Sequence, residues 1–481
     1  MGHLLVVESW VGSMSRLLPR AIREGGHEFT FVTRDLHHYL RATPGLPGDG
    51  THPLLAARNV VTADTNDVDA LLPLVERLHG VLGFDGVVSS CDYYLPAVAR
   101  IAERLGLPGP TVLAVEAACH KGLTRRVLAE AAVPGPRFAV CGDTARAAAA
   151  AREIGYPLVV KPVDLCGGML VREVRDEREL DSACRALSDF PVNARGQDRS
   201  PVLLLEELLT GPEVSVETVS FGGATHVVGV TDKSIGGAPA FIETGHMFPA
   251  GMAAGLEREA VDTAVAAINA LGLDHVVCHT EIKLTPRGPR VVEVNPRPAG
   301  NRITELVRHV TGVDLAAACL DVALGRRPDL TPRPTGVHSA AVAFLLPDTT
   351  GTLAGIDGAD DIRERSEVLE LALAEPGRTV RAATSNNEYL GHVMTVDTGG
   401  GGARETAERL LSRLRPTYVE DAAEGRAPEQ RTAEGSASDG GPPEDRAPAG
   451  GPPADRVPDD SPPGERVSEE RSVEPGPAVP A

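Results

Sequence analysis

The stretch HVVCHTEIKL, residues 275–284, and the stretch RVVEVN, residues 290–295, are typical of two strands of a β-hairpin. Between them, TPRGP at residues 285–289 is a polar five-residue turn, rich in the residue types that favour chain reversal. If Leu284 pairs with Arg290, the register of the whole hairpin follows, because the partners of all earlier residues are then fixed.

This register brings acidic residues together. Glu281 lies opposite Glu293, and His279 lies opposite Asn295. Two carboxylates that face each other across a sheet repel unless a cation compensates. Mg²⁺ prefers oxygen ligands and commonly takes one or two carboxylates together with substrate phosphates. The hairpin therefore predicts a site for Mg²⁺ (or Mn²⁺) formed by Glu281, Glu293 and Asn295, and the alternative is an exposed face with solvated acids.

Lysine is rare in this chain. Of 47 basic residues only four are lysine, namely Lys121, Lys161, Lys233 and Lys283, so each is a candidate for a place that needs a compact ammonium. Lys161 ends the predicted strand 157–162, which runs into a turn with Gly167 and Gly168. Glycines let backbone amides approach anionic oxygens, so this turn predicts a phosphate cover.

The first part of the chain alternates between strand and helix patterns. Residues 3–8 and 29–33 are apolar runs typical of buried strands, and residues 68–78 are helical in pattern. This alternation predicts an α/β unit with a parallel sheet, which ends near Pro110.

Composition excludes some classes of protein. The net charge of -20 argues against a nucleic-acid partner, and no apolar run is long enough for a membrane span. The start of the chain lacks a secretory pattern, and seven scattered cysteines are read as reduced thiols, so we expect a cytoplasmic protein. From about Val419 the sequence is rich in Pro, Gly and charged residues, which predicts a disordered acidic tail.

Five motifs in order resemble those of the ATP-grasp ligases. YPLVVKP at residues 156–162 is similar to the family's nucleotide-binding lysine strand, and His120-Lys121 is similar to its earlier lysine. EELL at residues 206–209, with Gly211 and Glu213, resembles the hinge that holds adenine and ribose, and the hairpin resembles the metal-binding hairpin. The resemblance implies that ATP is bound by Lys121, Lys161, Gly167, Gly168, Glu206, Glu207, Leu209 and Glu213.

Within that family the motifs are most similar to those of the L-amino-acid ligases. Glu243, His246 and Arg297 match residues that handle the substrate, which implies catalytic roles for all three. Arg297 offers a two-point fork for a carboxylate or acyl phosphate, and Glu243 can hold an ammonium group. Gly300 and Asn301, with Arg297, are implied to bind substrate; some family members carry a bulky aromatic where this chain has Asn301, so the substrate's identity stays open.

The resemblance implies an ATP-grasp fold and an ATP-dependent carboxylate–amine ligase that acts through an acyl phosphate on small molecules. It leaves a homodimer open. The expected organisation is an N-terminal Rossmann-like α/β domain at 1–112, a small α+β lid lobe at 113–205, a catalytic lobe with an antiparallel sheet at 206–326, a small C-terminal α+β domain at 327–416, and the tail at 417–481.

Other functions on the same scaffold remain open at this stage. A carboxylase like the biotin-dependent ones, or an enzyme like carbamoyl phosphate synthetase, would share these motifs. No lysine lies in a place suited to attach biotin, although a separate carrier protein would remove that objection. A nucleotide-binding regulator without catalysis is the alternative from another class.

Overall fold

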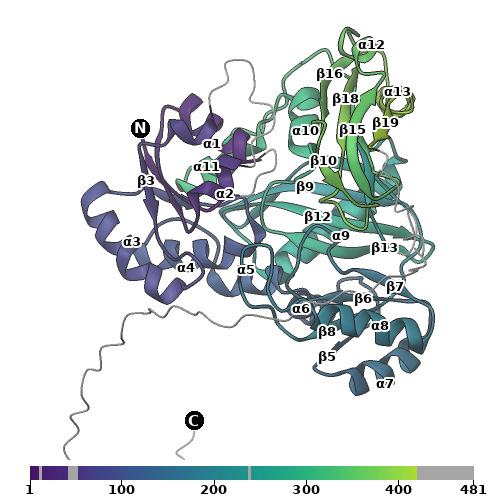
Figure 1. The fold of residues 1–481 in the computed structure, drawn as a ribbon. Helices are drawn as coiled ribbons and strands as arrows, with labels where there is room; N and C mark the ends of the chain where they lie inside the picture. The colour runs from purple at the N-terminus through teal and green to yellow at the C-terminus, as the bar shows by residue number, and fades with distance from the viewer. Residues whose placement is uncertain (10–13, 42–51, 237–239, 420–481) are drawn as a thin grey trace, which may run out of the picture. The chain divides into compact units, whose positions relative to one another are not determined.

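The computed structural model describes residues 1–9, 14–41, 52–236 and 240–419 (Figure 1). The predicted acidic tail lies outside these residues beyond position 419. The main sheets of the described residues are each packed against clusters of buried apolar side chains.

The N-terminal sheet is parallel, as predicted. Its order is β3-β2-β1-β4, formed by Asn59–Thr62, Glu28–Thr33, His3–Val7 and Gly86–Val88. Alternate residues of β1 point to opposite faces, so that Leu4 and Val6 join one core while Leu5 and Val7 join another. Helices cover both faces (Figure 1): α1 (Met14–Glu24) and α11 (Leu315–Ala323) pack on one, and α3 (Val68–Leu82) and α4 (Leu95–Leu105) on the other. The short α2 (Leu36–Arg41), η1 (Pro53–Ala56) and η2 (Asp92–Tyr94) complete this part.

Two consecutive helices lead from the N-terminal part to the lid lobe. α5 spans Val112–Cys119 and α6 spans Lys121–Glu130. The break falls at His120, whose extended backbone ends α5 and whose ring Nδ1 accepts the Leu123 N–H at 3.2 Å as the cap of α6. Lys121 is therefore the first residue of a helix, beside the carbonyl of Val163 to which its N–H is bonded.

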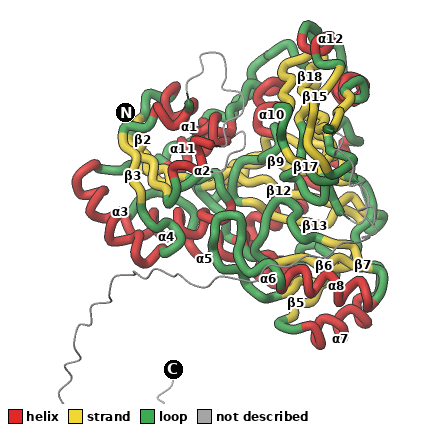
Figure 2. Tube along the Cα trace, viewed as in Figure 1, coloured by secondary structure: helices red, strands yellow, loops and turns green. Residues whose placement is uncertain are grey.

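The lid lobe is a four-stranded antiparallel sheet in the order β5-β8-β6-β7, with two helices against it (Figure 2). Apolar residues of β6 such as Leu158 and Val160 pack with Ala147, Ala151 and Leu180 of the helices. The elements are β5 (Phe138–Cys141), α7 (Thr144–Ile154), β6 (Leu158–Pro162), β7 (Arg172–Val174), α8 (Glu177–Ser188) and β8 (Leu203–Glu207).

The largest sheet has eight strands in the order β13-β12-β9-β10-β11-β14-β18-β16, all antiparallel. Its strands are β9 (Glu213–Phe221), β10 (Ala224–Ile235), β11 (Glu243–Phe248), β12 (Val276–Thr285), β13 (Gly288–Asn295), β14 (Ser339–Leu345), β16 (Val368–Leu373) and β18 (Gly391–Asp397). Strands from residue 339 onward extend the same sheet as the strands before residue 326. The predicted domain boundary between 326 and 327 therefore falls between strands of one sheet, and the domain boundaries stay predictions.

The remaining elements lie around this sheet. Helix α9 (Ala254–Leu271) packs its buried Ala260, Ala264 and Ile268 on the apolar residues of β9, β12 and β13. The other elements are α10 (Ile303–Thr311), α12 (Asp360–Arg363), α13 (Ala403–Leu411) and a small sheet of β17 (Thr379–Val380), β15 (Gly351–Asp357) and β19 (Arg415–Tyr418).

The metal hairpin has the predicted pairs but a different turn. Glu281 pairs with Glu293 and His279 with Asn295, as expected. The predicted pairing of Leu284 with Arg290 is wrong: Leu284 pairs with Pro289, and the strands extend to Thr285 and Gly288. A bulge between Glu281 and Ile282 leaves Val292 as an extra residue on β13, and this one-residue shift restores the predicted register at the acids.

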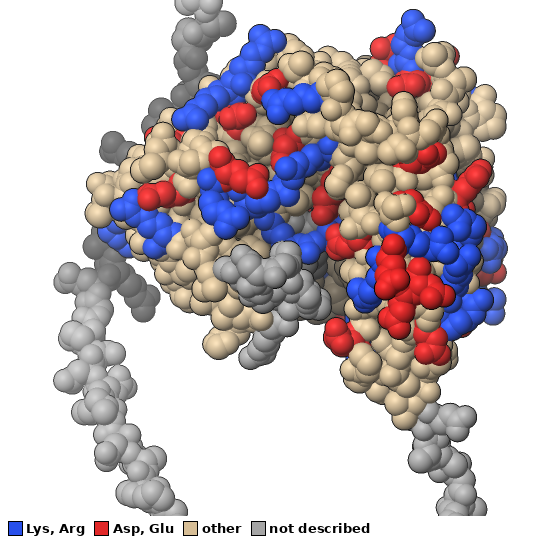
Figure 3. All heavy atoms as spheres, turned by 90° about the horizontal axis from the view of Figure 1, so that it is seen from above, with Lys and Arg blue, Asp and Glu red and all other residues tan. Residues whose placement is uncertain are grey.

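The surface carries mixed charges. Figure 3 shows, on one face, acidic and basic side chains lying next to one another rather than in separate areas. Arg100 and Asp69 form one exposed ion pair, at 2.6 Å, and pairs of this kind add little stability. All seven cysteines are free. Among the described residues we find no helix with the length and apolar character of a membrane span.

Candidate active site

A cavity of about 810 Å³ lies between the N-terminal part, the lid lobe and the large sheet. All but one of the site residues predicted from the sequence line it: Lys121, Lys161, Gly167, Gly168, Glu206, Glu207, Leu209, Glu213, Glu243, Glu281, Glu293, Asn295, Arg297, Gly300 and Asn301. His246 is the exception, because it is fully buried behind Glu243.

One face of the large sheet carries charged residues in register. Lys283 on β12 pairs with Glu213 on β9, and Glu213 pairs with Lys233 on β10. The alternating charges attract along this row: Lys283 Nζ lies 3.1 Å from one oxygen of Glu213, and Lys233 Nζ lies 3.0 Å from the other. Register alone therefore places two of the four lysines beside one carboxylate.

The next rows of the same face carry a hydrogen-bonded acid network. His279 pairs with Glu217 on β9, and its Nδ1 lies 3.0 Å from Glu217 Oε1, while its Nε2 lies 3.3 Å from Glu281 Oε1. Ser215 Oγ donates to Glu217 Oε1 at 2.7 Å. Burial opposes a charged ring, but the two neighbouring carboxylates outweigh it and raise the pKa of His279 to about 9. A protonated His279 thus bridges Glu217 and Glu281.

The two opposed hairpin carboxylates each have a lysine partner. Glu293 Oε1 lies 2.8 Å from Lys121 Nζ, and Glu281 Oε1 lies 2.7 Å from Lys233 Nζ. Burial disfavours the charged form of Lys121, but Glu293 outweighs this and raises the pKa of the lysine. Asn295 is buried beside them and lines the cavity. The lysines thus balance the repulsion that the sequence predicted between the two acids.

Lys161 lies at the lid side of the cavity. Its Nζ is 2.6 Å from Glu206 Oε2, and the other oxygen of Glu206 is 2.5 Å from Arg125 Nε. Burial alone would raise the pKa of Glu206, but Arg125 and Lys161 lower it to about 2. Burial lowers the pKa of Lys161, which shares this carboxylate with Arg125. Two cations on one acid leave a net positive charge at this end of the cavity.

The glycine turn faces the cavity with an unusual backbone. Gly167 and Gly168 both have positive φ, +68° and +71°, which favours glycine at both positions. The Asn386 N–H donates to the Gly167 carbonyl at 3.3 Å. This bond ties the turn to the loop that precedes β18.

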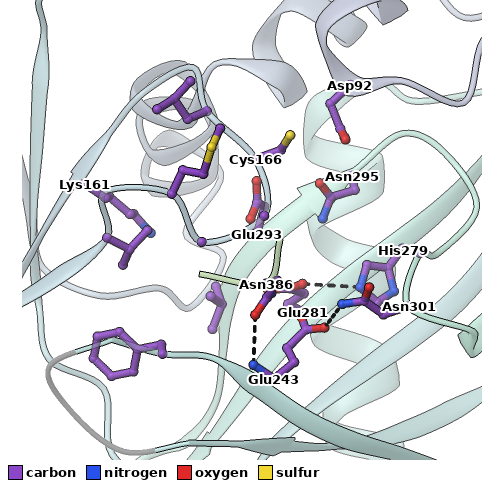
Figure 4. Close-up of a pocket in the computed structure, with 18 of the residues that line it drawn as sticks. Asp92, Lys161, Cys166, Glu243, His279, Glu281, Glu293, Asn295, Asn301 and Asn386 are labelled. Atoms are coloured by element: carbon purple, nitrogen blue, oxygen red, sulfur yellow. Dashed lines mark hydrogen bonds and ion pairs between the residues drawn. The ribbon is translucent and has the colours of Figure 1, made fainter. Parts of the chain in front are cut away.

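Glu243 also lines the cavity, held by several side chains (Figure 4). One oxygen is 3.1 Å from Lys233 Nζ, and the other accepts from Asn301 Nδ2 and lies 3.1 Å from His246 Nε2. Asn386 Oδ1 accepts the Glu243 N–H at 2.9 Å. Burial would raise the pKa of Glu243, but Lys233 outweighs it and the pKa lies well below its ordinary value. Glu243 is therefore an ionised carboxylate at the cavity wall, and His246 supports it from behind.

Arg297 enters the cavity after the metal hairpin. Its Nε donates to Asp92 Oδ1 at 2.6 Å, which joins the segment after β13 to the N-terminal part. Burial disfavours the charge, but Asp92 outweighs it and raises the pKa of Arg297. The guanidinium thus stays charged, and the hydrogen bond at its Nε edge fixes the orientation of its plane.

Comparison with known proteins agrees with this arrangement. Residues 20–109 match the ATP-grasp N-terminal domain, residues 154–305 the ATP-grasp domain, and residues 343–419 the L-amino acid ligase C-terminal domain 2. The chain is 30% identical to the uncharacterised protein y4rH of Sinorhizobium fredii over 86% of this chain and 84% of that protein. It belongs to the ATP-grasp family.

Other ATP-grasp relatives are enzymes that make C–N bonds. The alanine–anticapsin ligase of Bacillus subtilis is 29% identical over 70% of this chain and 77% of its own length. Human carnosine synthase 1 is 31% identical over 71% of this chain, which spans 42% of that larger protein. The crystal structure of the L-amino acid ligase of Bacillus licheniformis superposes with a TM-score of 0.73 over 87% of this chain and 99% of its own, at 24% identity, and shows the same fold. This protein is accordingly an ATP-grasp ligase that forms carbon–nitrogen bonds.

ATP-grasp enzymes use ATP and a divalent metal, and the donor set here fits such a metal. Glu281 and Glu293 face each other and Asn295 adds an amide oxygen, all hard ligands. Within the described ranges no group of three or more His, Cys, Asp or Glu side chains is arranged to hold a metal by itself. The set therefore suits an ion that takes its other ligands from phosphates and water, as Mg²⁺ does.

Three cavity residues of this ATP-grasp ligase were missed from the sequence. Asp92 lies about 200 positions before Arg297, and Asn386 and Tyr389 lie more than 140 positions after Glu243. The Tyr389 hydroxyl donates to the Glu243 carbonyl at 2.9 Å. No local pattern signals these contacts, because folding alone brings the segments together. Lys233 had one signal, the rarity of lysine in this chain.

Proposed function

We propose that this protein joins a carboxylic acid, most simply an amino acid, to an amine at the expense of ATP, through an acyl phosphate. The observation that carries the proposal is a single cavity lined by two unlike sets of groups. Lys121, Lys161 and the glycine turn provide positive charge and backbone amides, and Arg297 and Glu243 provide one fork and one carboxylate.

The first set supports binding of ATP phosphates. Lys161 and Lys121 each contact a carboxylate, yet an ammonium has three N–H donors, so each can also contact a phosphate oxygen. Gly167 and Gly168 supply the open backbone of a phosphate cover. Glu206, Glu207, Leu209 and Glu213 follow on from the lid sheet and are the candidates for holding adenine and ribose.

The hairpin supports binding of the metal. Glu281, Glu293 and Asn295 would hold Mg²⁺ or Mn²⁺ against the phosphates, where it would neutralise negative charge. Lys121 contacts Glu293, and its Nζ also donates to the Leu165 carbonyl, in the loop before the glycine turn, at 2.6 Å. It is therefore well placed to release Glu293 to a metal and to contact a phosphate instead.

The second set supports recognition of an amino acid. Arg297 offers a planar fork to the carboxylate, while Glu243 offers an ionised partner for an ammonium group. Gly300 and Asn301 follow Arg297 on the chain and also line the cavity, and Asn301 Nδ2 donates to Glu243. An amino acid carries both groups that this pair would recognise, whereas a simple acid carries one.

The reaction has two steps. An oxygen of the bound carboxylate attacks the γ-phosphorus of ATP, the bond from that phosphorus to the bridging oxygen breaks, and ADP leaves with the electron pair. The amine nitrogen then attacks the acyl carbon, the C–O bond to phosphate breaks, and phosphate leaves and takes up the proton that the nitrogen loses. The protein's part is to align the reactants, spread the developing charge with Lys121, Lys161 and Arg297, and exclude water under the lid lobe.

Release of ADP in the presence of candidate substrates tests the proposal. The protein is incubated with ATP, Mg²⁺ and pairs drawn from the proteinogenic L-amino acids, with detection of ADP and of dipeptide by mass spectrometry. We expect ADP and dipeptide in equal amounts for at least one pair. ADP release that needs bicarbonate, with no dipeptide from any pair, would instead indicate the carboxylase-like chemistry that shares this scaffold.

A further inference from the structure

Lys233 is the cavity lysine with the most partners. It lies on β10, its side chain is 1% exposed, and it lines the cavity between the metal hairpin and Glu243. Its Nζ lies 2.7 Å from Glu281, 3.0 Å from Glu213 and 3.1 Å from Glu243. Three carboxylates from three different strands thus meet at one ammonium.

Lys233 differs from Lys161 and Lys121 in the number of carboxylates that it contacts. Its contact with Glu281 is a hydrogen bond, and its contacts with Glu213 and Glu243 are ion pairs. Among the described residues, Lys161 contacts one carboxylate, and Lys121 contacts one carboxylate and one backbone carbonyl. Lys233 is therefore the lysine that joins several carboxylates of the cavity at one point.

The three carboxylates belong to different parts of the proposed site. Glu281 is a candidate metal ligand, Glu243 is the candidate partner of the substrate ammonium, and Glu213 lies beside the candidate nucleotide hinge. Like charges this close repel, and without a central cation the side chains would turn apart. Lys233 removes this repulsion and at the same time sets where each oxygen lies.

We propose that Lys233 is a positioning residue that holds Glu281 toward the metal and Glu243 toward the substrate ammonium at once. The proposal rests on the proposed function for the role of Glu243. Its metal half concerns the hairpin of any ATP-grasp enzyme and can be tested separately.

Metal binding distinguishes a positioning lysine from one that only neutralises charge, because removal of the two would change the metal affinity in opposite directions. A lysine that only neutralises charge competes with the metal for Glu281, so removing it would strengthen the negative field and tighten metal binding. A positioning lysine fixes the ligand in its productive place, and loss of such outer partners commonly weakens metal binding by about 10-fold to 100-fold. The direction of the change therefore separates the two roles.

The test measures two affinities in Lys233→Met, which keeps the length of the side chain and loses its charge. Binding of Mn²⁺ in the presence of ADP is followed by electron paramagnetic resonance, and binding of the best L-amino acid substrate by calorimetry. We expect both affinities to fall by about 10-fold or more. Unchanged or tighter Mn²⁺ binding, or unchanged amino acid binding in a folded variant, overturns the proposal.

Two further variants keep the result interpretable. Lys233→Arg keeps the charge, and so protects the fold, but its flat fork cannot meet three carboxylates from one point. We expect it to weaken Mn²⁺ binding as well, and wild-type affinity for both ligands in this variant would also overturn the proposal. Asp232→Asn is the matched control, because Asp232 is the next residue on β10, points to the other face and pairs with Arg404 at 2.9 Å. It should leave both affinities unchanged.

The two hypotheses fail in different ways. If the wild-type protein binds Mn²⁺ with ADP but no amino acid, the proposed substrate is wrong, and the Mn²⁺ measurement still tests Lys233. If the wild type binds both and Lys233→Met binds both equally well, the role of Lys233 is wrong and the proposed function stands.

Discussion

Arg297 and Asp92 form a half-buried ion pair at the wall of the cavity, with Arg297 Nε donating to Asp92 Oδ1 at 2.6 Å. The bond uses the Nε edge of the guanidinium and fixes its plane. Arg297 Nη1 also donates to the Pro298 carbonyl at 3.1 Å. Asp92 thereby sets the orientation of the fork that the proposed reaction presents to the substrate carboxylate.

Removing the charge of Asp92 should lower kcat/KM for the acid substrate and leave KM for ATP unchanged. In Asp92→Asn the amide can still accept a hydrogen bond, but it no longer holds the guanidinium by charge. We expect kcat/KM for the carboxylate substrate to fall about 10-fold with KM for ATP unchanged, measured by steady-state kinetics at saturating concentrations of the other substrate. An equal loss for both substrates would show that Asp92 acts on the fold of the cavity as a whole.

Replacing Arg297 by lysine tests geometry at constant charge. Lysine keeps the positive charge but loses the planar two-point fork. We expect the turnover number of Arg297→Lys to fall about a hundredfold, the scale of losing one transition-state donor, while ATP affinity changes little. If ATP binding is lost and carboxylate binding is kept, ATP and the carboxylate have been assigned to the wrong residues of the cavity.

Replacing Glu293 by glutamine tests the metal site. Glu293→Gln keeps the shape but loses the charge that would hold Mg²⁺, and it leaves Lys121 without its 2.8 Å partner. We expect no measurable turnover and an unchanged circular dichroism spectrum, whereas Glu130→Gln, at the exposed last residue of α6, should behave as wild type. Wild-type rates in Glu293→Gln at ordinary magnesium concentrations would refute the metal assignment.

The acid Glu206 should make stability depend on pH. Because its pKa is lowered from 4.5 to about 2, the stability that it contributes is fully present above pH 4.5 and is lost as pH falls toward 2. Glu206→Gln leaves Arg125 and Lys161 buried without their acid and should cost about 3–5 kcal/mol near neutral pH. Below pH 4.5 the difference between wild type and variant should narrow by about 1.4 kcal/mol per pH unit, measured by urea unfolding. If the difference in the free energy of unfolding between wild type and Glu206→Gln stays constant down to pH 3, the stabilising role of the ionised Glu206 is refuted.

Local patterns in the sequence predicted the elements that carry the chemistry. The pairing of Glu281 with Glu293 is confirmed, although the turn was predicted wrongly, because a bulge at Val292 offsets a shift of one residue at Leu284. At the bulge, the Val292 carbonyl accepts from Arg125 Nη2 at 2.6 Å, a contact with a residue far away in sequence. The alternation of side chains along a strand predicts which face of the sheet a residue lies on, but it does not predict an extra residue such as Val292.

Contacts between distant segments explain what sequence reasoning missed. His246 was predicted to act in catalysis, but β11 turns its ring behind Glu243, and this depends on the neighbouring strands β10 and β14. Asp92 and Asn386 reach the cavity from segments that carry no motif of their own. The roles of the predicted site residues stay hypotheses that the variants above test.

Transfer of oxygen-18 tests the central claim, the activation of a carboxylate by ATP, most directly. The wild-type protein is given ATP, Mg²⁺, an amine and an amino acid whose carboxylate carries oxygen-18, and the released phosphate is analysed by phosphorus-31 nuclear magnetic resonance. Since the attacking carboxylate oxygen stays on phosphorus when the amine displaces phosphate, we predict one labelled oxygen in each phosphate formed. Phosphate without label, released together with the amide product, would contradict the acyl phosphate mechanism.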